Sequence, residues 1–250
     1  MTPLLAIIGG TGLAALDNLQ ITGSDHLSTP YGEPSGPLIR GQLGDRSVIF
    51  LARHGLHHTL PPHKINYRAN LWALHQTGVR RIIAVAAVGG IRDDMAPGAL
   101  EFPDQIIDYT YGRDCTFFEE DLSEVTHIDF TEPYCADLRN RLILAARQLH
   151  LGARESCTYA AMSGPRLETT AEIRKLARDG CDIVGMTGMP EAALARELGL
   201  RYATCAVVAN WAAGKVEGQI TMAEIEKNLQ HSMAQVKSLL VQLISQLDLP

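Results

Sequence analysis

Two short segments with anion-binding residue types each follow an apolar, strand-like run. Leu4–Ile8 leads into Gly9-Gly10-Thr11-Gly12, and Ser47–Ala52 leads into Arg53-His54-Gly55. Glycine lets backbone N–H groups approach a phosphate closely, and arginine and histidine add charged donors. In open α/β sheets, ligands collect outside the carboxyl ends of such strands. We therefore expect a small-anion site where these two strands end.

Other polar residues carry weaker signals when each is considered alone. Glu168 follows a turn-forming stretch and precedes a helical pattern, where the helix dipole favours any carboxylate. Asn210 ends an apolar run, and asparagine at a strand end often only forms a turn. Neither Cys205 nor Ser163 has a base or an oxyanion loop near it in the sequence. Covalent catalysis is therefore not expected.

Four histidines, His54, His57, His58 and His63, lie within one short stretch. No Asp, Glu or Cys lies among them, so the stretch does not predict a closed zinc site. We expect His58 and His63 to shape a loop or an interface.

Strand-like runs alternate with helical patterns along the chain. Strands are expected near residues 4–8, 37–41, 47–52, 81–87, 99–108, 156–162, 182–186 and 202–208. Helices are expected over 65–77, 135–149, 170–179 and 190–198, followed by a long terminal helix. Thr169–Glu172 and Thr221–Glu224 read as capping boxes that open two of these helices. The alternation predicts an α/β protein with a largely buried sheet, and residues 1–250 form one domain because no linker or repeat interrupts them.

Composition excludes several classes of function. The chain has 250 residues and a net charge of −6, and no basic stripe offsets that charge, which argues against a general nucleic-acid or membrane-surface binder. The apolar runs are too short to span a bilayer. Five scattered cysteines without a Cys-x-x-Cys pair, and an N-terminus without export features, predict a reduced, cytoplasmic protein.

The polar segment 109–133 has little periodicity. Long loops inside a compact domain are usually functional or covered by a neighbour, so this segment is a candidate for a subunit contact.

Five segments together resemble the purine nucleoside phosphorylase family, and most of all its methylthioadenosine phosphorylase branch. They are Ile7–Leu13, Leu51–Gly55, Asn66–Asn70, Gly164–Arg166 and Gly185–Glu191. The resemblance implies a single-domain α/β nucleoside phosphorylase fold, with a distorted, partly barrel-like mixed sheet flanked by helices. It also implies a homotrimer, and a pentosyltransferase reaction of purine salvage that uses inorganic phosphate as co-substrate and needs no metal or organic cofactor.

The resemblance assigns roles to individual positions. Thr11, Arg53, His54 and Thr187 match the family's phosphate ligands. Ala86 and Ala87 match another phosphate-side segment, in which Ala86 replaces a hydroxyl residue and only backbone N–H groups can serve. Met186 matches the residue that lies against the ribose. Leu167 replaces an aromatic residue beside base and sugar, so stacking is expected to be weaker.

The base pocket predicts the kind of purine. Methylthioadenosine phosphorylases have a small hydroxyl residue and an Asp where this chain has Glu168 and Asn210, whereas 6-oxopurine phosphorylases have Glu and Asn. A Glu168 carboxylate can accept N1–H of a 6-oxopurine but would face a lone pair on adenine. The Asn210 amide can donate to O6 and accept N7–H, which stabilises the leaving base. Each buried mismatch costs about 1–3 kcal/mol, so we expect a preference for hypoxanthine-type bases.

The sugar pocket predicts the 5′ substituent. Met222 and Ile225 align with the residues near the 5′ group and form an apolar, sulfur-tolerant wall. Ala212 replaces a second Asp of the family, and His127 matches a residue that reaches the 5′ pocket across the trimer interface. Combining both ends, the expected reaction is phosphorolysis of 5′-methylthioinosine to hypoxanthine and 5-methylthioribose 1-phosphate.

Three alternatives remain at this point. The chain could be a methylthioadenosine phosphorylase with an unusual pocket, or an inosine/guanosine phosphorylase. Ala86 and Leu167 also leave open a phosphate or nucleoside sensor that has lost turnover.

Overall fold

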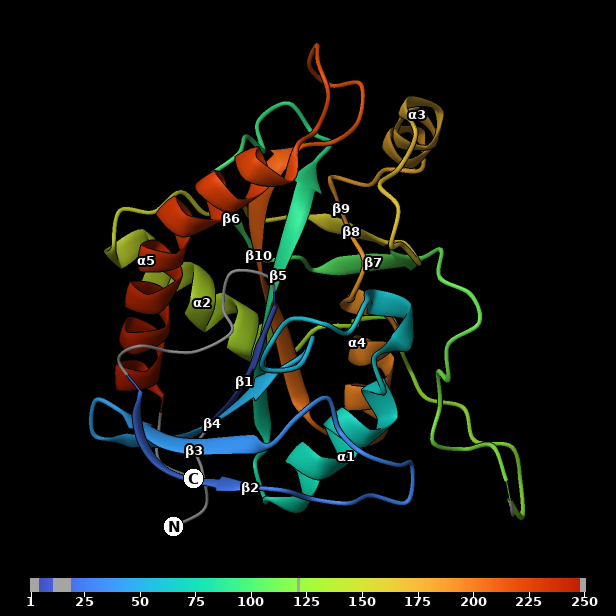
Figure 1. Ribbon diagram of the computed structural model, residues 1–250, viewed down its shortest axis with the longest axis vertical. Coiled ribbons are helices and arrows are strands. Elements are labelled where there is room, and N and C mark those ends of the chain that lie inside the picture. The colour runs from blue at the N-terminus through green and yellow to red at the C-terminus, as the bar shows by residue number, and fades with distance from the viewer. Residues whose placement is uncertain (1–4, 11–18, 121, 248–250) are drawn as a thin grey trace.

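A computed structural model describes residues 5–10, 19–120 and 122–247 of the chain (Figure 1). In this part of the chain, ten strands form one mixed sheet, and the predicted α/β class is confirmed. Its centre is made of parallel strands β1 (Leu5–Gly9), β4 (Arg46–Ala52), β5 (Arg81–Gly90) and β10 (Arg201–Trp211). These runs are rich in Ile, Val and Ala and are buried almost throughout, as strands covered on both faces must be.

Shorter strands extend the sheet on both sides. They are β2 (Gln20–Asp25), β3 (Leu38–Leu43), β6 (Leu100–Glu101), β7 (Gln105–Asp108), β8 (Thr158–Ala161) and β9 (Ile183–Gly185). The order is β2-β3-β4-β1-β5-β9-β8-β7, and β10 joins β5 to β6. Strand β5 thus pairs with three strands, β1, β9 and β10, and this branching distorts the sheet.

Helices cover both faces of the sheet, as Figure 1 shows. On one side lie α2 (Ala136–Gln148) and α5 (Met222–Gln246), which pack against each other and against β10. On the other lie α1 (Tyr67–Gln76) and α4 (Gly188–Glu197), while α3 (Thr170–Arg178) packs beside β9 through a small cluster of its own. A 3-10 turn, η1 (Pro62–Lys64), precedes α1.

Several helix starts follow the predicted chemistry. Thr169 and Glu172 form the full capping box that opens α3. At α5 the Thr221 hydroxyl accepts the Glu224 N–H, which is one half of the box predicted there. In α4 Met189 is non-helical (φ −118°, ψ 141°), so the regular helix begins at Pro190, as expected of a proline at a first helical position.

The structure corrects two predictions. The single strand expected over 99–108 is two strands, β6 and β7, which pair with different neighbours. Pro103 lies between them and cannot donate to a ladder. Strand β2 was not expected, because its residues are polar and largely exposed at the edge of the sheet.

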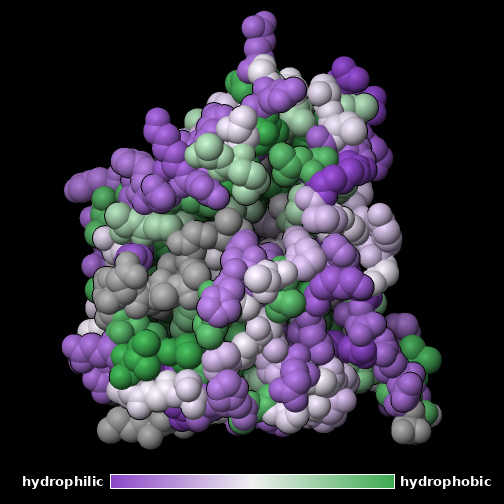
Figure 2. Space-filling model, viewed as in Figure 1, coloured by the Kyte–Doolittle hydropathy of each residue, from purple (hydrophilic) through white to green (hydrophobic). Residues whose placement is uncertain are grey.

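None of the helices that the structure describes is long and apolar enough to cross a bilayer. Figure 2 shows a face covered mostly by hydrophilic side chains, with apolar ones in small patches.

Candidate functional site

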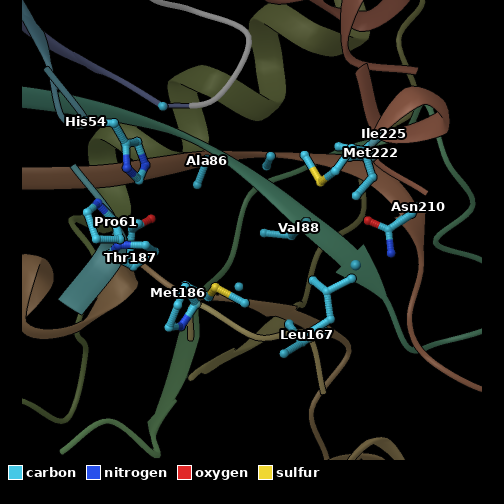
Figure 3. A pocket seen from close by; sticks show the side chains of 18 of the residues that line it. His54, Pro61, Ala86, Val88, Leu167, Met186, Thr187, Asn210, Met222 and Ile225 are labelled. Carbon is cyan, nitrogen blue, oxygen red and sulfur yellow. The ribbon is translucent and has the colours of Figure 1, made fainter. Parts of the chain in front are cut away.

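A cavity of about 480 Å³ lies beside β5, where β1 and β4 end. This volume is in the range of small-molecule sites. Sequence-predicted residues that line it are Arg53, His54, Ala86, Ala87, Leu167, Glu168, Met186, Thr187, Asn210, Ala212, Met222 and Ile225. Thr11 lies outside the described residues. Figure 3 shows His54 and Thr187 at one end of the cavity and Asn210 and Leu167 at the other, with Met186 between them.

The ends of the two strands that precede the predicted anion-binding segments are neighbours. Gly9 and Ala52 pair in the parallel register of β1 and β4, and the Arg53 N–H donates to the Gly9 carbonyl at 3.0 Å. A Cβ on Gly10 would lie 2.6 Å from the Val85 carbonyl oxygen. Only glycine fits there, so the chain passes close to β5 and to Arg53.

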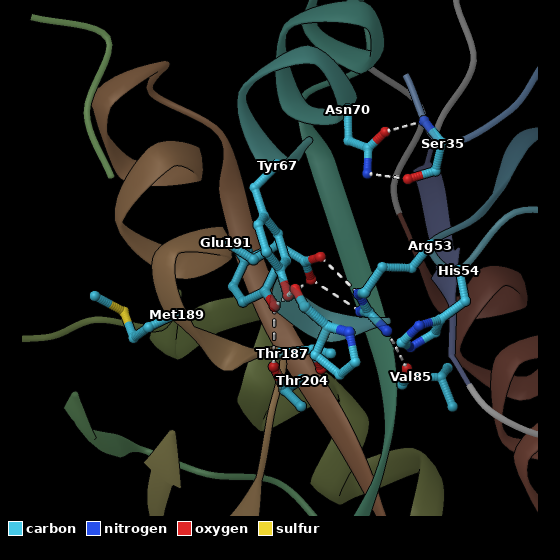
Figure 4. A network of polar contacts seen from close by, with 12 residues as sticks. Ser35, Arg53, His54, Tyr67, Asn70, Val85, Thr187, Met189, Glu191 and Thr204 are labelled. Carbon is cyan, nitrogen blue, oxygen red and sulfur yellow. Dashed lines mark hydrogen bonds and ion pairs between the residues drawn. The ribbon is translucent and has the colours of Figure 1, made fainter. Parts of the chain in front are cut away.

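Arg53 is fixed by a buried carboxylate. Its Nε and Nη2 donate to Glu191 at 2.7 and 2.9 Å, and its Nη1 donates to the Val85 carbonyl at 3.0 Å (Figure 4). Tyr202 also donates its hydroxyl to Glu191, at 2.8 Å. Burial alone lowers the pKa of Arg53, but the Glu191 carboxylate more than offsets this and holds the pKa above its ordinary value. A permanent cation therefore lines the cavity in one orientation.

His54 is neutral beside this cation. Burial, with the nearby Arg53 charge, lowers the pKa of His54 to about 4. Its Nδ1 lies 2.8 Å from the Leu60 carbonyl oxygen, which can only accept, so Nδ1 carries the proton. Nε2 is consequently an acceptor, suited to a protonated oxyanion oxygen or to taking up a proton.

The remaining residues at this end come from α4 and β5. Thr187 directly precedes α4, and its side chain is mostly buried. Ala86 and Ala87 lie within β5 and line the cavity. The missing hydroxyl at Ala86 leaves this wall apolar.

The other end combines an amide with a carboxyl. Asn210 donates Nδ2–H to the Trp211 carbonyl at 2.8 Å, which fixes the amide as donor on that side. Glu168 is half-buried in the loop before α3, and burial raises its pKa above the ordinary value. Leu167 stands at the rim with 42% of its surface exposed, which is consistent with little contact to a ring.

An apolar wall adjoins Asn210. Met222 and Ile225, from the first turns of α5, lie toward the same end of the cavity as Asn210 (Figure 3). Ala212 is buried and adds only a methyl group. This wall offers dispersion contacts and no charge.

His127 is not brought to this cavity by its own chain. It is exposed in the segment 109–133 and is absent from the lining that the described residues form. Its assignment across a subunit interface stays a prediction.

Sequence reasoning missed Glu191 as a supporting residue. It lies within a recognised segment, yet its fully buried carboxylate was given no role. The available signal was a carboxylate inside the otherwise apolar stretch 188–195, which needs a cationic partner when buried.

Two curated relatives are similar to this chain over nearly its whole length. A probable S-methyl-5′-thioinosine phosphorylase of Pseudomonas syringae pv. tomato is 56% identical over 96% of this chain and 98% of its own length. A 6-oxopurine nucleoside phosphorylase of Pyrococcus furiosus is 46% identical over 96% of this chain and 91% of its own.

A solved structure has the same fold over nearly the whole chain. The methylthioadenosine phosphorylase of Schistosoma mansoni in complex with adenine superposes with a TM-score of 0.93 and 33% identity, over 97% of this chain and 91% of that one. The sequence profile of the Phosphorylase superfamily matches residues 4–245. The chain therefore belongs to the phosphorylase superfamily.

Proposed function

We propose that the protein catalyses phosphorolysis of S-methyl-5′-thioinosine, giving hypoxanthine and 5-methylthioribose 1-phosphate. The observation that carries this proposal is that Glu168 and Asn210 line one end of a cavity whose other end holds Arg53 and His54. Relatives with 52–56% identity bear the name probable S-methyl-5′-thioinosine phosphorylase. The product would return a purine base to salvage and recycle the methylthio sugar.

Base recognition rests on hydrogen-bond polarity. The ionised Glu168 carboxylate accepts N1–H of the 6-oxopurine. The Asn210 amide donates its second Nδ2–H to O6, and its Oδ1 accepts N7–H once N7 is protonated as the base departs. Adenine presents a lone pair at N1 and an amino group at C6, so both contacts are mismatched, at about 1–3 kcal/mol each.

The apolar wall of the cavity favours a methylthio group at the 5′ position. Ile225 and the 60% exposed Met222 give a methylthio group van der Waals contacts and offer a 5′-hydroxyl no hydrogen-bonding side chain. Met186 lies between the two ends of the cavity, where the ribose would lie.

Catalysis needs positioning and electrostatics. Phosphate is held by Arg53, His54, Thr187, Thr11 and the backbone of Ala86 and Ala87. The glycosidic bond loosens to an oxocarbenium-like sugar, which the adjacent phosphate dianion stabilises. The bonding electrons pass into the purine, which gains a proton at N7 while the hydrogen phosphate gives one up, and Asn210 then holds N7–H and O6 of the departing base. A phosphate oxygen then bonds to the anomeric carbon, and no metal or organic cofactor takes part.

Assembly and location complete the proposal. A homotrimer would bring His127 of the segment 109–133 to the 5′ pocket of a neighbouring subunit. The exposed Tyr111 and Val125 of the same segment support such a contact, because large apolar side chains on a surface favour association. The five free cysteines support a reducing, cytoplasmic location.

One assay tests the proposal against its rivals. Phosphate-dependent base release is measured from methylthioinosine, methylthioadenosine and inosine under identical conditions. We expect the highest kcat/KM with methylthioinosine. Equal or greater efficiency on methylthioadenosine would contradict the base assignment, and preference for inosine would contradict the 5′ assignment. Binding without base release from any of the three would identify a sensor.

A further inference from the structure

We propose that Asn228 is a positioning residue that sets substrate specificity by anchoring the bulge from which Asn210 projects. Asn228 lies on α5 and donates Nδ2–H to the Ala209 carbonyl at 2.7 Å. The inference rests on the proposed function, since it concerns how the base-binding amide is held.

Asn210 is aimed by an irregularity of β10. Val208 pairs with Val88 and Asn210 pairs with Gly89, so Ala209 is an extra residue between two successive pairs. In a regular strand successive side chains alternate between the faces, and an extra residue re-aims those that follow it. The bulge therefore decides that Asn210, rather than Trp211, lines the cavity.

Asn228 ties this bulge to helix α5. Its own carbonyl accepts the hydroxyl of Ser232, a fully buried residue one turn further along α5. Ile225 lies one turn earlier on the same helix face, at the spacing of three and four residues. A single helix face thus carries the apolar wall and the anchor of the base-binding amide.

The hydrogen bond from Asn228 to Ala209 links the helix that forms the apolar wall to the strand that carries the base-binding amide. Asn210 meets O6 and N7–H together only when its amide is held by Trp211 on one side and the bulge is held by Asn228 on the other. If Ala209 is released, the amide can rotate away from the 6-oxopurine edge. Phosphate binding does not depend on this anchor, because Arg53 and His54 are held by Glu191 and Leu60.

The test uses Asn228→Asp, which keeps the size of the side chain and places an acceptor against the Ala209 carbonyl. Asn228→Ala is a milder second variant that only removes the donor. Asn140→Asp and Asn140→Ala, at an exposed position of α2, are the matched controls. For each protein, kcat and KM are measured for methylthioinosine, methylthioadenosine and phosphate, together with the thermal midpoint.

We expect both Asn228 variants to lose about ten- to a hundredfold in kcat on methylthioinosine, as misplaced site groups do, with an unchanged KM for phosphate. The ratio of kcat/KM for methylthioinosine over methylthioadenosine should fall, more in Asn228→Asp than in Asn228→Ala. A purely structural role would lower the thermal midpoint and every kcat equally, and an unchanged ratio in Asn228→Ala would overturn the inference. Failure of the proposed function would already be visible in the unmodified enzyme, as no base release from methylthioinosine.

Discussion

Arg53 and Glu191, 138 positions apart in the sequence, form a bidentate ion pair in which both side chains are at most 1% exposed. The pair connects the end of β4 to the start of α4, which Thr187 directly precedes. The Glu191 carboxylate thereby orients one of the groups assigned to phosphate, the Arg53 guanidinium. Arg53 supplies the positive charge, and Glu191 fixes the orientation of the Arg53 guanidinium group.

Replacing Glu191 with Gln should therefore affect stability and phosphate binding together. A broken buried ion pair leaves an uncompensated charge and costs about 3–5 kcal/mol in the free energy of unfolding. We expect a loss of this size in urea denaturation, together with a raised KM for phosphate. Glu119→Gln removes a partly exposed partner of Arg68 and should cost less than about 1 kcal/mol. Similar losses in the two variants would contradict the structural role assigned to Glu191.

His54 should remain uncharged in the free enzyme throughout the physiological range. Because burial and Arg53 lower its pKa from 6.5 to about 4, its neutral form is favoured in the folded state. The stability that this contributes is present above pH 6.5 and is lost as the pH falls toward 4. An NMR titration of the imidazole, assigned with His54→Asn, should show its midpoint well below pH 6. A midpoint near 6.5 would contradict the neutral acceptor proposed at Nε2.

Base selectivity should weaken in acid. Burial raises the pKa of Glu168 above its ordinary 4.5, so its carboxyl protonates sooner than an exposed one as the pH falls. A protonated carboxyl can donate to N1 of adenine and no longer penalises that base. The ratio of kcat/KM for methylthioinosine over methylthioadenosine should therefore decrease from pH 8 to pH 5. In Glu168→Gln the same ratio should stay level, and a matching decrease there would assign the effect to another group.

Ionisation of Glu101 should lower the free energy of unfolding as the pH rises from about 4.5 through 7. Burial raises its pKa to about 7, although the paired Arg154 opposes this. A raised carboxyl pKa means that its contribution is fully favourable below pH 4.5 and is lost as the pH rises through 7. In Glu101→Gln the free energy of unfolding should change less between pH 5 and pH 8 than in the unmodified protein. Identical pH profiles would show that Glu101 does not titrate in this range.

Much of the site follows from sequence because it lies at strand ends. Gly9 and Arg53 each follow an apolar run, and the parallel pairing of those runs brings these two residues together. The strand-like run 99–108 was misjudged because its apolar residues continue across Pro103, while the two halves pair with different strands. The spacing of apolar residues in the sequence indicates where strands lie, but it does not indicate which strands pair with each other.

Other features depend on contacts between distant parts of the chain. The bulge at Ala209 has no local signature, since Val207-Val208-Ala209-Asn210 reads as uninterrupted strand. The partnership of Glu191 with Arg53 joins residues that no local pattern relates. His127 is absent from the cavity lining that the described residues form, and its role across a subunit interface stays a prediction.

The central claim is that the hydrogen-bond polarity of residues 168 and 210 selects the base. The most direct test is the double variant Glu168→Ser with Asn210→Asp, assayed for kcat/KM on methylthioinosine and methylthioadenosine. The account predicts that preference moves toward the 6-aminopurine by a factor of about ten or more, because two mismatches of about 1 kcal/mol or more each are relieved. A substrate ratio identical to that of the unmodified enzyme would contradict it.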